Sequence, residues 1–453
     1  MDIRHLIDHG PMSGIQLRAV SLCFWLNMLD GVDILSISFA APLLSREWDI
    51  PPATLGVVFS AALAGMMAGS MLLAPFGDSI GRRKVLCLSL LLIAIGMLGA
   101  PFAGSVQELL IVRFITGVGI GGVVPTMAAF ASELSPLRRR SFAVTLVQGG
   151  YPLGATITGL LALWLVPMFG WQSLFVLGGA LTLLSLPFVY FVLPESPEFL
   201  LSKQPPGALA KLNGFLKAMG QAELAALPPQ PAADAPRGAA QFIAALGSLF
   251  SAAHRAATLL LWVAFFMSLA TLYFLQNWVP QLTANAGLAD SQAFLAGTIL
   301  NLGAFAGMAS VGYLADHFGL RRVIASYLGA GAVALLFFSY LQSTAAILVG
   351  LGVIGLMQGG FIGLYAVGAR IYPAGIRVTG IGWAIGIARS GAVLGPYVAG
   401  LLVASGMGMG GSFMVFAIPL AIAACAVLAM RKPELQTGAR SAAGRRAAAE
   451  AHN

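Results

Sequence analysis

Long apolar stretches make up most of this chain, and short polar or charged segments separate them. A helix needs about 20 mostly apolar residues to cross the hydrocarbon core of a bilayer. By this measure the sequence predicts an all-α polytopic membrane protein with twelve spans. We place the spans at residues 17–42, 54–77, 84–102, 107–131, 141–166, 171–193, 256–281, 292–315, 322–342, 345–369, 378–404 and 411–430.

One long polar segment divides the twelve spans into two groups of six. It begins with Pro194-Glu195-Ser196-Pro197-Glu198 and contains further prolines, so it cannot cross a membrane. We expect it to be a cytoplasmic loop with some short helix. The predicted organisation is an N-terminal six-helix bundle, the central loop, a C-terminal six-helix bundle and a disordered tail, at residues 1–193, 194–255, 256–430 and 431–453.

The composition excludes several classes of protein. Of the 453 residues, 58% are hydrophobic and 9% are charged, whereas a soluble globular domain carries about 25% charged residues. A soluble enzyme, a nucleic-acid-binding protein, a disordered regulator and a disulfide-stapled secreted domain are therefore poor fits. Cys23, Cys87 and Cys425 lie in apolar runs without metal-ligand spacing, and we expect neither a metal nor a cofactor.

The net charge of +8 is explained by topology. When both termini are placed in the cytoplasm, 22 of the 25 basic residues fall on cytoplasmic segments, as the positive-inside rule requires. The basic excess therefore needs no nucleic-acid partner. We expect a monomer in the bacterial inner membrane, with the lipid bilayer as its surroundings.

The two halves of the chain repeat each other. Asp78-x-x-Gly81-x-Arg83 follows the second span and Asp316-x-x-Gly319-x-Arg321 follows the eighth, and 316 − 78 = 238. Gln148-x-Gly150 in the fifth span has its counterpart in Arg389-x-Gly391 in the eleventh, and 389 − 148 = 241. Repeats of this kind are typical of transporters built from two homologous bundles around a central path.

These motifs resemble those of the major facilitator superfamily over the whole chain. The superfamily pattern G-x-x-x-D-R/K-x-G-R-R/K is matched by residues 74–83, with departures at Ala74 and Ser79. A second copy at residues 312–321 has His317 and Leu320 at two basic positions. Further resemblances to the superfamily are Arg113-x3-Gly117-x-Gly119 in the fourth span and Pro194-Glu195-Ser196-Pro197 after the sixth.

Within the superfamily, the chain resembles the aromatic acid:proton symporters. Asp30-Gly31-Val32-Asp33 in the first span matches their D-G-x-D pattern, and residues 372–391 are also similar. The resemblance implies proton-coupled uptake of an aromatic acid by alternating access. Sugar porters share the Pro-Glu-Ser-Pro and Tyr-Pro-x3-Arg elements, so a sugar porter stays open as an alternative.

Four charged residues lie well inside the predicted spans: Asp30, Asp33, Arg113 and Arg389. A buried charge costs at least about 2.5–3.5 kcal/mol on insertion scales, so each needs a reason. Asp30 and Asp33 share one helix face with Asn27, and we interpret them as a proton-binding pair. The alternatives are a structural polar cluster or an aspartate held ionised by a buried arginine. For Arg113, proton transfer and a structural hydrogen bond are equally open.

Arg389 lies near the middle of the eleventh span, where its guanidinium can bind a carboxylate through two hydrogen bonds. We interpret it as the anchor of an anionic substrate, and the alternative is an ion pair with one of the aspartates. Aromatic and amide side chains could complete a pocket for an aromatic ring, although Trp and Tyr near span ends are commonly interfacial. The candidates are Asn27, Gln148, Tyr151, Tyr273, Gln276, Asn277, Trp278, Asn301, Gln358, Tyr365 and Trp383.

Charged residues at the cytoplasmic ends of the spans form a second candidate set. Ion pairs among them could close a cytoplasmic gate, while simple helix capping is the alternative. The gate candidates are Asp78, Arg82, Glu133, Arg138, Glu195, Asp316, Arg321 and Arg377.

From these features we predict a proton-coupled importer of a small aromatic carboxylate of the benzoate or hydroxybenzoate type. A sugar or other organic-acid porter and an exporter are the alternatives within the same fold. An intramembrane enzyme is disfavoured, because the spans contain no metal-ligand spacing and no Ser–His pair.

Overall fold

The computed structural model describes residues 3–228, 247–251, 254–372 and 374–430, and in this part of the chain every regular element is a helix. By length and composition, twelve of the described helices can cross a membrane. The predicted all-α fold with twelve spans is therefore confirmed. The predicted disordered tail at 431–453 and the side chain of Arg377 lie outside the described residues.

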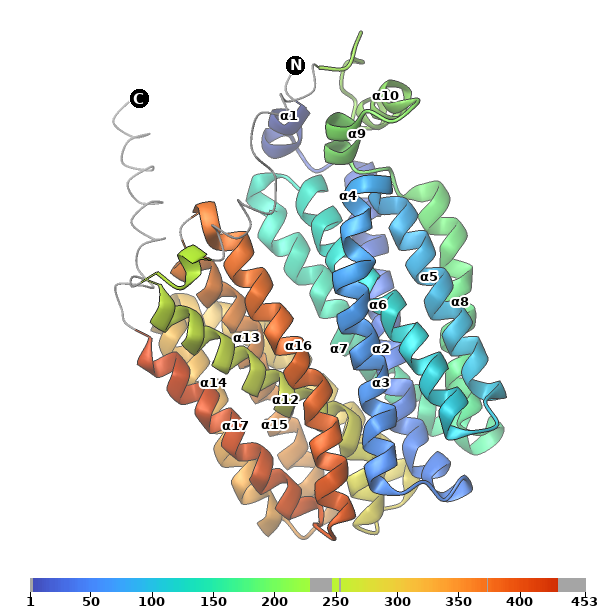
Figure 1. The fold of residues 1–453 in the computed structure, drawn as a ribbon, viewed down its shortest axis with the longest axis vertical. Helices are drawn as coiled ribbons and strands as arrows, with labels where there is room; N and C mark the ends of the chain where they lie inside the picture. The colour runs from blue at the N-terminus through green and yellow to red at the C-terminus, as the bar shows by residue number, and fades with distance from the viewer. Residues whose placement is uncertain (1–2, 229–246, 252–253, 373, 431–453) are drawn as a thin grey trace. The chain divides into compact units, whose positions relative to one another are not determined.

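The chain forms two compact units, Met1–Asp49 with Val57–Ala233 and Ile50–Gly56 with Asp234–Asn453. Helices of the first half, shown from blue to green in Figure 1, are α1 (Ile3–His9), α2 (Gly14–Glu47), α3 (Pro52–Leu72), η1 (Ala74–Phe76), α4 (Gly77–Ile80), α5 (Arg82–Gly99), η2 (Ala100–Phe102), α6 (Val106–Leu134), α7 (Leu137–Phe169), α8 (Gln172–Val192), α9 (Pro197–Lys203) and α10 (Ala208–Ala218).

The second half repeats the pattern of six long helices. Its elements are α12 (Arg255–Asn285), α13 (Asp290–Phe318), α14 (Leu320–Phe337), η3 (Phe338–Tyr340), α15 (Thr344–Ile371), α16 (Ala374–Ala404) and α17 (Met409–Ala429).

Several helices are longer than the predicted spans. For example, α7 covers Leu137–Phe169, where the apolar pattern indicated 141–166. The hydropathy of a sequence marks the part of a helix that lies in hydrocarbon, whereas backbone hydrogen bonding continues into the polar ends.

In the central loop, the Ser196 hydroxyl accepts a hydrogen bond from the Phe199 N–H at 3.1 Å and caps α9.

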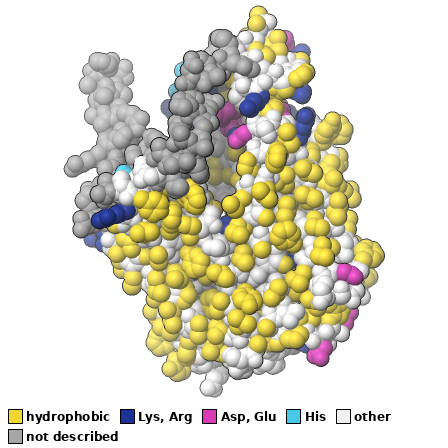
Figure 2. All heavy atoms as spheres, in the orientation of Figure 1, with side chains coloured by type: hydrophobic (Ala, Val, Ile, Leu, Met, Phe, Trp, Pro, Cys, Tyr) yellow, Lys and Arg dark blue, Asp and Glu magenta, His cyan; other side chains and the backbone are white. Residues whose placement is uncertain are grey.

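The outer surface is apolar over the length of the helices. Phe102, Trp164 and Phe191 are at least 75% exposed, and hydrophobic side chains cover most of the face shown in Figure 2. Charged side chains on that face gather toward the helix ends. An apolar surface of this kind on the helices of each unit is unsuited to water and suits a bilayer.

The internal repeat of the sequence is also present in the close helix contacts that glycines make. A Cβ atom placed on Gly69 of α3 would lie 2.0 Å from the Val118 carbonyl oxygen of α6, and one on Gly307 of α13 would lie 2.0 Å from that of Leu356 in α15. Since 307 − 69 = 238 and 356 − 118 = 238, the offset of the sequence repeat recurs in these contacts.

A second pair of contacts follows the offset of 241 residues that relates the fifth span to the eleventh. On α7, a Cβ at Gly154 would lie 2.0 Å from the Met28 carbonyl oxygen of α2, and on α16 one at Gly395 would lie 2.2 Å from that of Ala270 in α12. Here 395 − 154 = 241 for the glycines and 270 − 28 = 242 for the residues that they contact. Small residues let helix backbones approach closely, which is the main source of helix association in lipid. Each unit is therefore held together by the same two glycine-mediated helix pairs.

We predict that Gly395→Ala lowers the thermal midpoint of the purified protein, because its methyl group would push α16 away from α12. The loss should correspond to about 1–3 kcal/mol, as for overpacked cores. Gly386→Ala is the matched control on the same helix, since a Cβ there meets nothing within 4 Å. It should leave the midpoint unchanged or raise it slightly. Intrinsic fluorescence during a thermal ramp in detergent measures both, and equal midpoints would contradict the prediction.

Candidate functional site

A buried ion pair joins α2 to α6 in the first unit. Arg113 Nη1 donates to Asp33 Oδ1 at 2.9 Å, and the side chains of Arg113 and Asp33 are 2% and 0% exposed. The Arg113 guanidinium also lies over the Phe175 ring of α8, 5.9 Å from its centroid. Within the described residues, Asp33 Oδ2 and Arg113 Nε have no hydrogen-bond partner. The pair is therefore desolvated and only partly satisfied.

Asp30 and Asn27 continue this polar face of α2. Asp30 is 7% exposed and lies one turn before Asp33, and Asn27 Nδ2 donates to the Val147 carbonyl of α7 at 2.6 Å. From the sequence, the roles of Asp30 and Asp33 could not be separated, and no partner could be assigned to Arg113. The structure distinguishes the two aspartates, because the ion pair with Arg113 is made by Asp33.

In the second unit, Arg389 lies on α16 beside an aromatic group. Arg389 is half-buried, and its guanidinium is close enough to the Tyr365 hydroxyl of α15 to act on that group electrostatically if it ionises. The Phe265 ring of α12 packs edge-on against both Tyr365 and Phe361, with centroids 5.1 and 5.9 Å apart. A cationic guanidinium next to aromatic rings is suited to an anion with an aromatic body.

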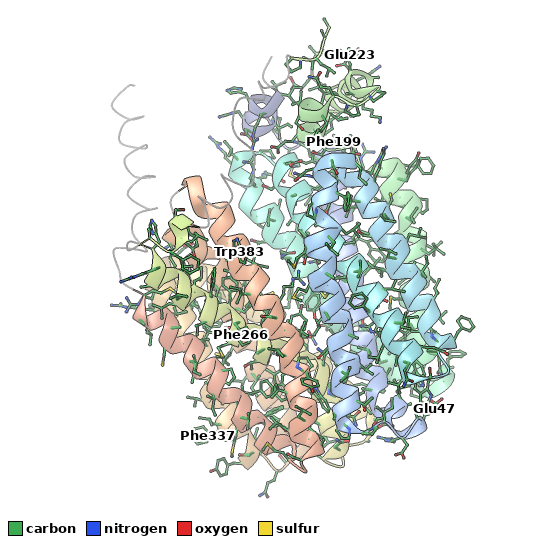
Figure 3. All side chains as sticks on the ribbon, viewed as in Figure 1. Glu47, Phe199, Glu223, Phe266, Phe337 and Trp383 are labelled. Atoms are coloured by element: carbon green, nitrogen blue, oxygen red, sulfur yellow. The ribbon has the colours of Figure 1, made fainter. Side chains whose placement is uncertain are left out.

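The remaining pocket candidates are divided between the two units. Gln148 and Tyr151 lie on α7, half-buried, in the first unit. In the second, Gln276 is buried on α12, Asn277 Nδ2 donates to the Tyr273 carbonyl at 2.8 Å, and Gln358 lies on α15. Trp383 of α16, labelled in Figure 3, stacks on Trp262 of α12 at 6.2 Å. The Phe250 ring also meets Trp262 edge-on at 5.5 Å, so Trp383 is part of an aromatic cluster at α12 and α16.

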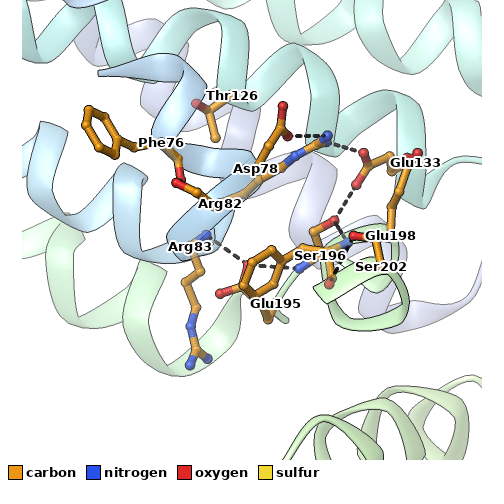
Figure 4. Close-up of polar contacts among 12 residues, drawn as sticks. Phe76, Asp78, Arg82, Arg83, Thr126, Glu133, Glu195, Ser196, Glu198 and Ser202 are labelled. Atoms are coloured by element: carbon orange, nitrogen blue, oxygen red, sulfur yellow. Dashed lines mark hydrogen bonds and ion pairs between the residues drawn. The ribbon is translucent and has the colours of Figure 1, made fainter. Parts of the chain in front are cut away.

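An ion-pair network lies at one end of the first unit (Figure 4). Arg82 is paired with Asp78 at 3.4 Å and with Glu133 of α6. Glu133 also accepts a hydrogen bond from the Ser196 hydroxyl at 2.7 Å. The network thus connects α4, α5 and α6 with the start of the central loop.

Glu195 anchors the loop to the turn before α5. Its Oε1 atom accepts from the backbone N–H of Arg83 at 3.1 Å and from that of Ser196 at 3.0 Å. Gly81 makes this possible, because it has φ +108 and a Cβ there would lie 2.6 Å from Glu195 Oε2. The sequence did not indicate Ser196 as a member of this network, although it belongs to the Pro194-Glu195-Ser196-Pro197 motif.

The other gate candidates are not part of this network. Arg138 and Asp316 are exposed, and among the described residues neither has an ion-pair partner within 4.0 Å. Arg321 donates instead to the Met430 carbonyl at 2.8 Å. In the second half the position equivalent to Arg82 is Leu320, since 320 − 82 = 238, and leucine cannot pair with a carboxylate.

Comparison with known proteins identifies relatives over nearly the whole chain. The Major Facilitator Superfamily model matches residues 23–366 and 261–451. A gallate transporter of Pseudomonas putida is 32% identical over 436 residues, covering 95% of both chains. The 4-hydroxybenzoate transporter PcaK of Acinetobacter baylyi is 33% identical and covers 94% of this chain and 93% of its own. A benzoate transport protein of the same species is 31% identical, with 92% and 90% covered.

Solved structures share the fold at lower sequence identity. The xylose transporter XylE of E. coli, in a partially occluded inward-open conformation, has a TM-score of 0.70 at 18% identity and covers 91% of this chain and 97% of its own. A bacterial homologue of the human lysosomal transporter Spinster has a TM-score of 0.70 at 16% identity, with 91% of this chain and 96% of its own covered.

We predict that Asp33 and Arg113 contribute to stability as a pair, so that the effects of their single substitutions are not additive. Asp33→Leu leaves a buried guanidinium that cannot lose its proton, which costs about 3–5 kcal/mol. Arg113→Met should cost less, because a lone buried carboxyl can be neutralised by a proton. The double variant should be closer to wild type than Asp33→Leu. Thermal midpoints in detergent measure the cycle, and additive losses would show that the pair is not coupled.

Proposed function

Because the chain belongs to the major facilitator superfamily, we propose that it is a proton-coupled transporter that imports a small aromatic carboxylate by alternating access. The observation that carries this proposal is the set of relatives at 31–33% identity over at least 92% of the chain, which transport gallate, 4-hydroxybenzoate and benzoate. All three are benzene rings with a carboxylate. The proposal includes a monomer in the bacterial inner membrane with cytoplasmic termini, as the basic residues favour.

We assign the substrate carboxylate to Arg389. Support comes from its place in the middle of α16, its half-buried guanidinium and the rings of Tyr365 and Phe265 nearby. Among the described residues no carboxylate lies within 4.0 Å of Arg389, which leaves its donors for a ligand. Further ligand contacts are proposed for Asn27, Gln148, Tyr151, Gln276, Asn277, Gln358, Tyr365 and Trp383.

We assign proton coupling to Asp30, Asp33 and Arg113. Protonation of Asp33 would break its ion pair with Arg113, and Arg113 would keep its charge in a buried place. The transported proton is therefore assigned to Asp30, and the Asp33–Arg113 pair stays ionised beside it. One proton with one monoanion is electroneutral, so the pH gradient alone drives uptake, at about 1.36 kcal/mol per pH unit.

A cytoplasmic gate completes the proposal. Its proposed members are the network residues Asp78, Arg82, Glu133 and Glu195, with Arg138, Asp316, Arg321 and Arg377 at the other helix ends. The buried contacts of Glu133 and Glu195 support a role for the first four, because several elements must separate when such a network opens.

We predict that Arg389→Gln abolishes uptake of radiolabelled 4-hydroxybenzoate into cells. Arg389→Lys should reduce uptake about 10- to 100-fold, because lysine keeps the charge but loses the two-hydrogen-bond geometry. Arg370→Lys is the matched control, since Arg370 is exposed at the end of α15, and it should transport normally. Wild-type uptake by both Arg389 variants would overturn the assignment.

The same assay separates this proposal from its alternatives. Radiolabelled xylose should not accumulate, which distinguishes the protein from a sugar porter. A protonophore should lower accumulation in an importer and raise it in an exporter.

We predict that Asp30→Asn abolishes accumulation driven by a pH gradient but preserves exchange of labelled for unlabelled substrate. Exchange needs no net proton movement, whereas accumulation does. Proteoliposomes with and without an inside-alkaline gradient separate the two activities. The control is Asp49→Asn, which neutralises an exposed aspartate whose φ of 49 asparagine also accepts. Gradient-driven accumulation by Asp30→Asn would refute the assignment.

A further inference from the structure

A small cavity lies inside the second unit between α12, α14, α15 and α17. Its volume is about 20 Å³, enough for one oxygen atom of a hydroxyl group or a water molecule. Ser268 and Thr271 of α12 and Gln358 and Phe361 of α15 line it, and the rest of its wall is leucine and isoleucine. The polar part of the lining therefore comes from two facing helices.

Two of these polar residues have unmet hydrogen-bonding capacity. The Ser268 side chain is buried, at 2% exposure, and within the described residues its Oγ atom has no partner. Neither Nε2 nor Oε1 of Gln358 has a hydrogen-bond partner among the described residues. Thr271 differs, because its hydroxyl is 3.2 Å from the Phe416 carbonyl and 3.3 Å from that of Met267. Buried polar groups without partners are costly, so such a cluster calls for a bound polar atom.

The cavity is continuous in sequence and packing with the aromatic group at Arg389. Gln358, Phe361 and Tyr365 are spaced i, i+3 and i+7 and share one face of α15. Phe265 packs on Phe361 and Tyr365, and Ser268 follows it by one turn on α12. Arg389 interacts with the Tyr365 end of this row, about 10 Å along the helix from Gln358. A cation and a neutral hydrogen-bonding pair thus lie at opposite ends of one aromatic row.

We propose that the Ser268–Gln358 cavity binds a ring hydroxyl of the substrate, so that the protein selects aromatic carboxylates hydroxylated opposite the carboxylate. This inference rests on the proposed function, because it takes the Arg389 end as the carboxylate site. A phenolic hydroxyl donates one hydrogen bond and accepts others. Gln358 Oε1 accepts from it, and Gln358 Nε2 or the Ser268 hydroxyl donates to it. The ring lies against Phe361.

The position of the hydroxyl on the ring follows from this arrangement. A hydroxyl in the 4-position points away from the carboxylate and reaches the cavity. One in the 2-position stays beside the carboxylate at the Arg389 end. Benzoate has no hydroxyl and leaves Ser268 and Gln358 without a ligand partner, and a site built to bind a hydroxyl discriminates against an analogue that lacks it.

The test is displacement of radiolabelled benzoate from the full-length purified protein by benzoate, 2-hydroxybenzoate and 4-hydroxybenzoate. Wild type should bind 4-hydroxybenzoate most tightly. Ser268→Ala should weaken 4-hydroxybenzoate about three- to tenfold, the effect of one hydrogen bond. The same variant should leave the other two ligands within about twofold. Gln358→Leu should give the same selective loss and serves if Ser268→Ala cannot be purified.

Thr271→Val is the matched control, because it removes a hydroxyl from the same cavity that is already hydrogen-bonded. It should not change the preference among the three ligands. Equal effects of Ser268→Ala on all three ligands, or none, would overturn the hydroxyl site and indicate a permanently bound water. Equal wild-type affinities would also overturn it while leaving the proposed function intact. If wild type binds none of the three, the proposed function fails and the hydroxyl site with it.

Discussion

Close approach of helix backbones at glycine is the constraint on which each unit depends. Helices surrounded by lipid gain little by burying apolar side chains against each other, so association relies on packing at short range. At Gly69, Gly154, Gly307 and Gly395 there is no room for even one methyl group, because the carbonyl oxygen of the neighbouring helix occupies its place. These contacts fix the helices that carry Asp33, Arg113 and Arg389, and so they set the geometry available for chemistry.

Buried charge is the second constraint, and the two units meet it differently. In the first unit, Arg113 and Asp33 neutralise each other 2.9 Å apart in a place without solvent. In the second, Arg389 is half-buried with Tyr365 beside it, and no carboxylate of the described residues pairs with it. An ion pair whose two charges neutralise each other suits a conformational or proton-linked role. A guanidinium without a carboxylate partner suits an anionic ligand.

Sequence alone was sufficient for the helices and insufficient for their contacts. Twelve spans could be predicted because hydrocarbon imposes one length and one composition on every crossing. An aspartate held ionised by a buried arginine was one alternative that the sequence left open. Which aspartate and which arginine form the pair could not be predicted, because 80 residues separate Asp33 from Arg113 and hydropathy contains no distance between helices. Ser268 was missed for another reason. Serine and threonine in apolar helices commonly donate to the carbonyl of the preceding turn, as Thr283 and Thr298 do, and the sequence does not show that Ser268 lacks such a bond.

The two halves preserve backbone geometry and differ in charge, which indicates where the chemistry lies. Gly81 and Gly319 both have positive φ, at +108 and +88, in the same turn of each half. Yet Leu320 replaces Arg82, and Gln148 of the first half is replaced by Arg389 in the second. A residue required by the path of the backbone must recur in both copies of a repeat. A charged residue that is present in only one copy is not required by the path of the backbone. Its charge must therefore be explained by contacts in its own unit. In the first unit the ion pairs of Arg82 supply that explanation; in the second, the proposed ligand supplies it for Arg389.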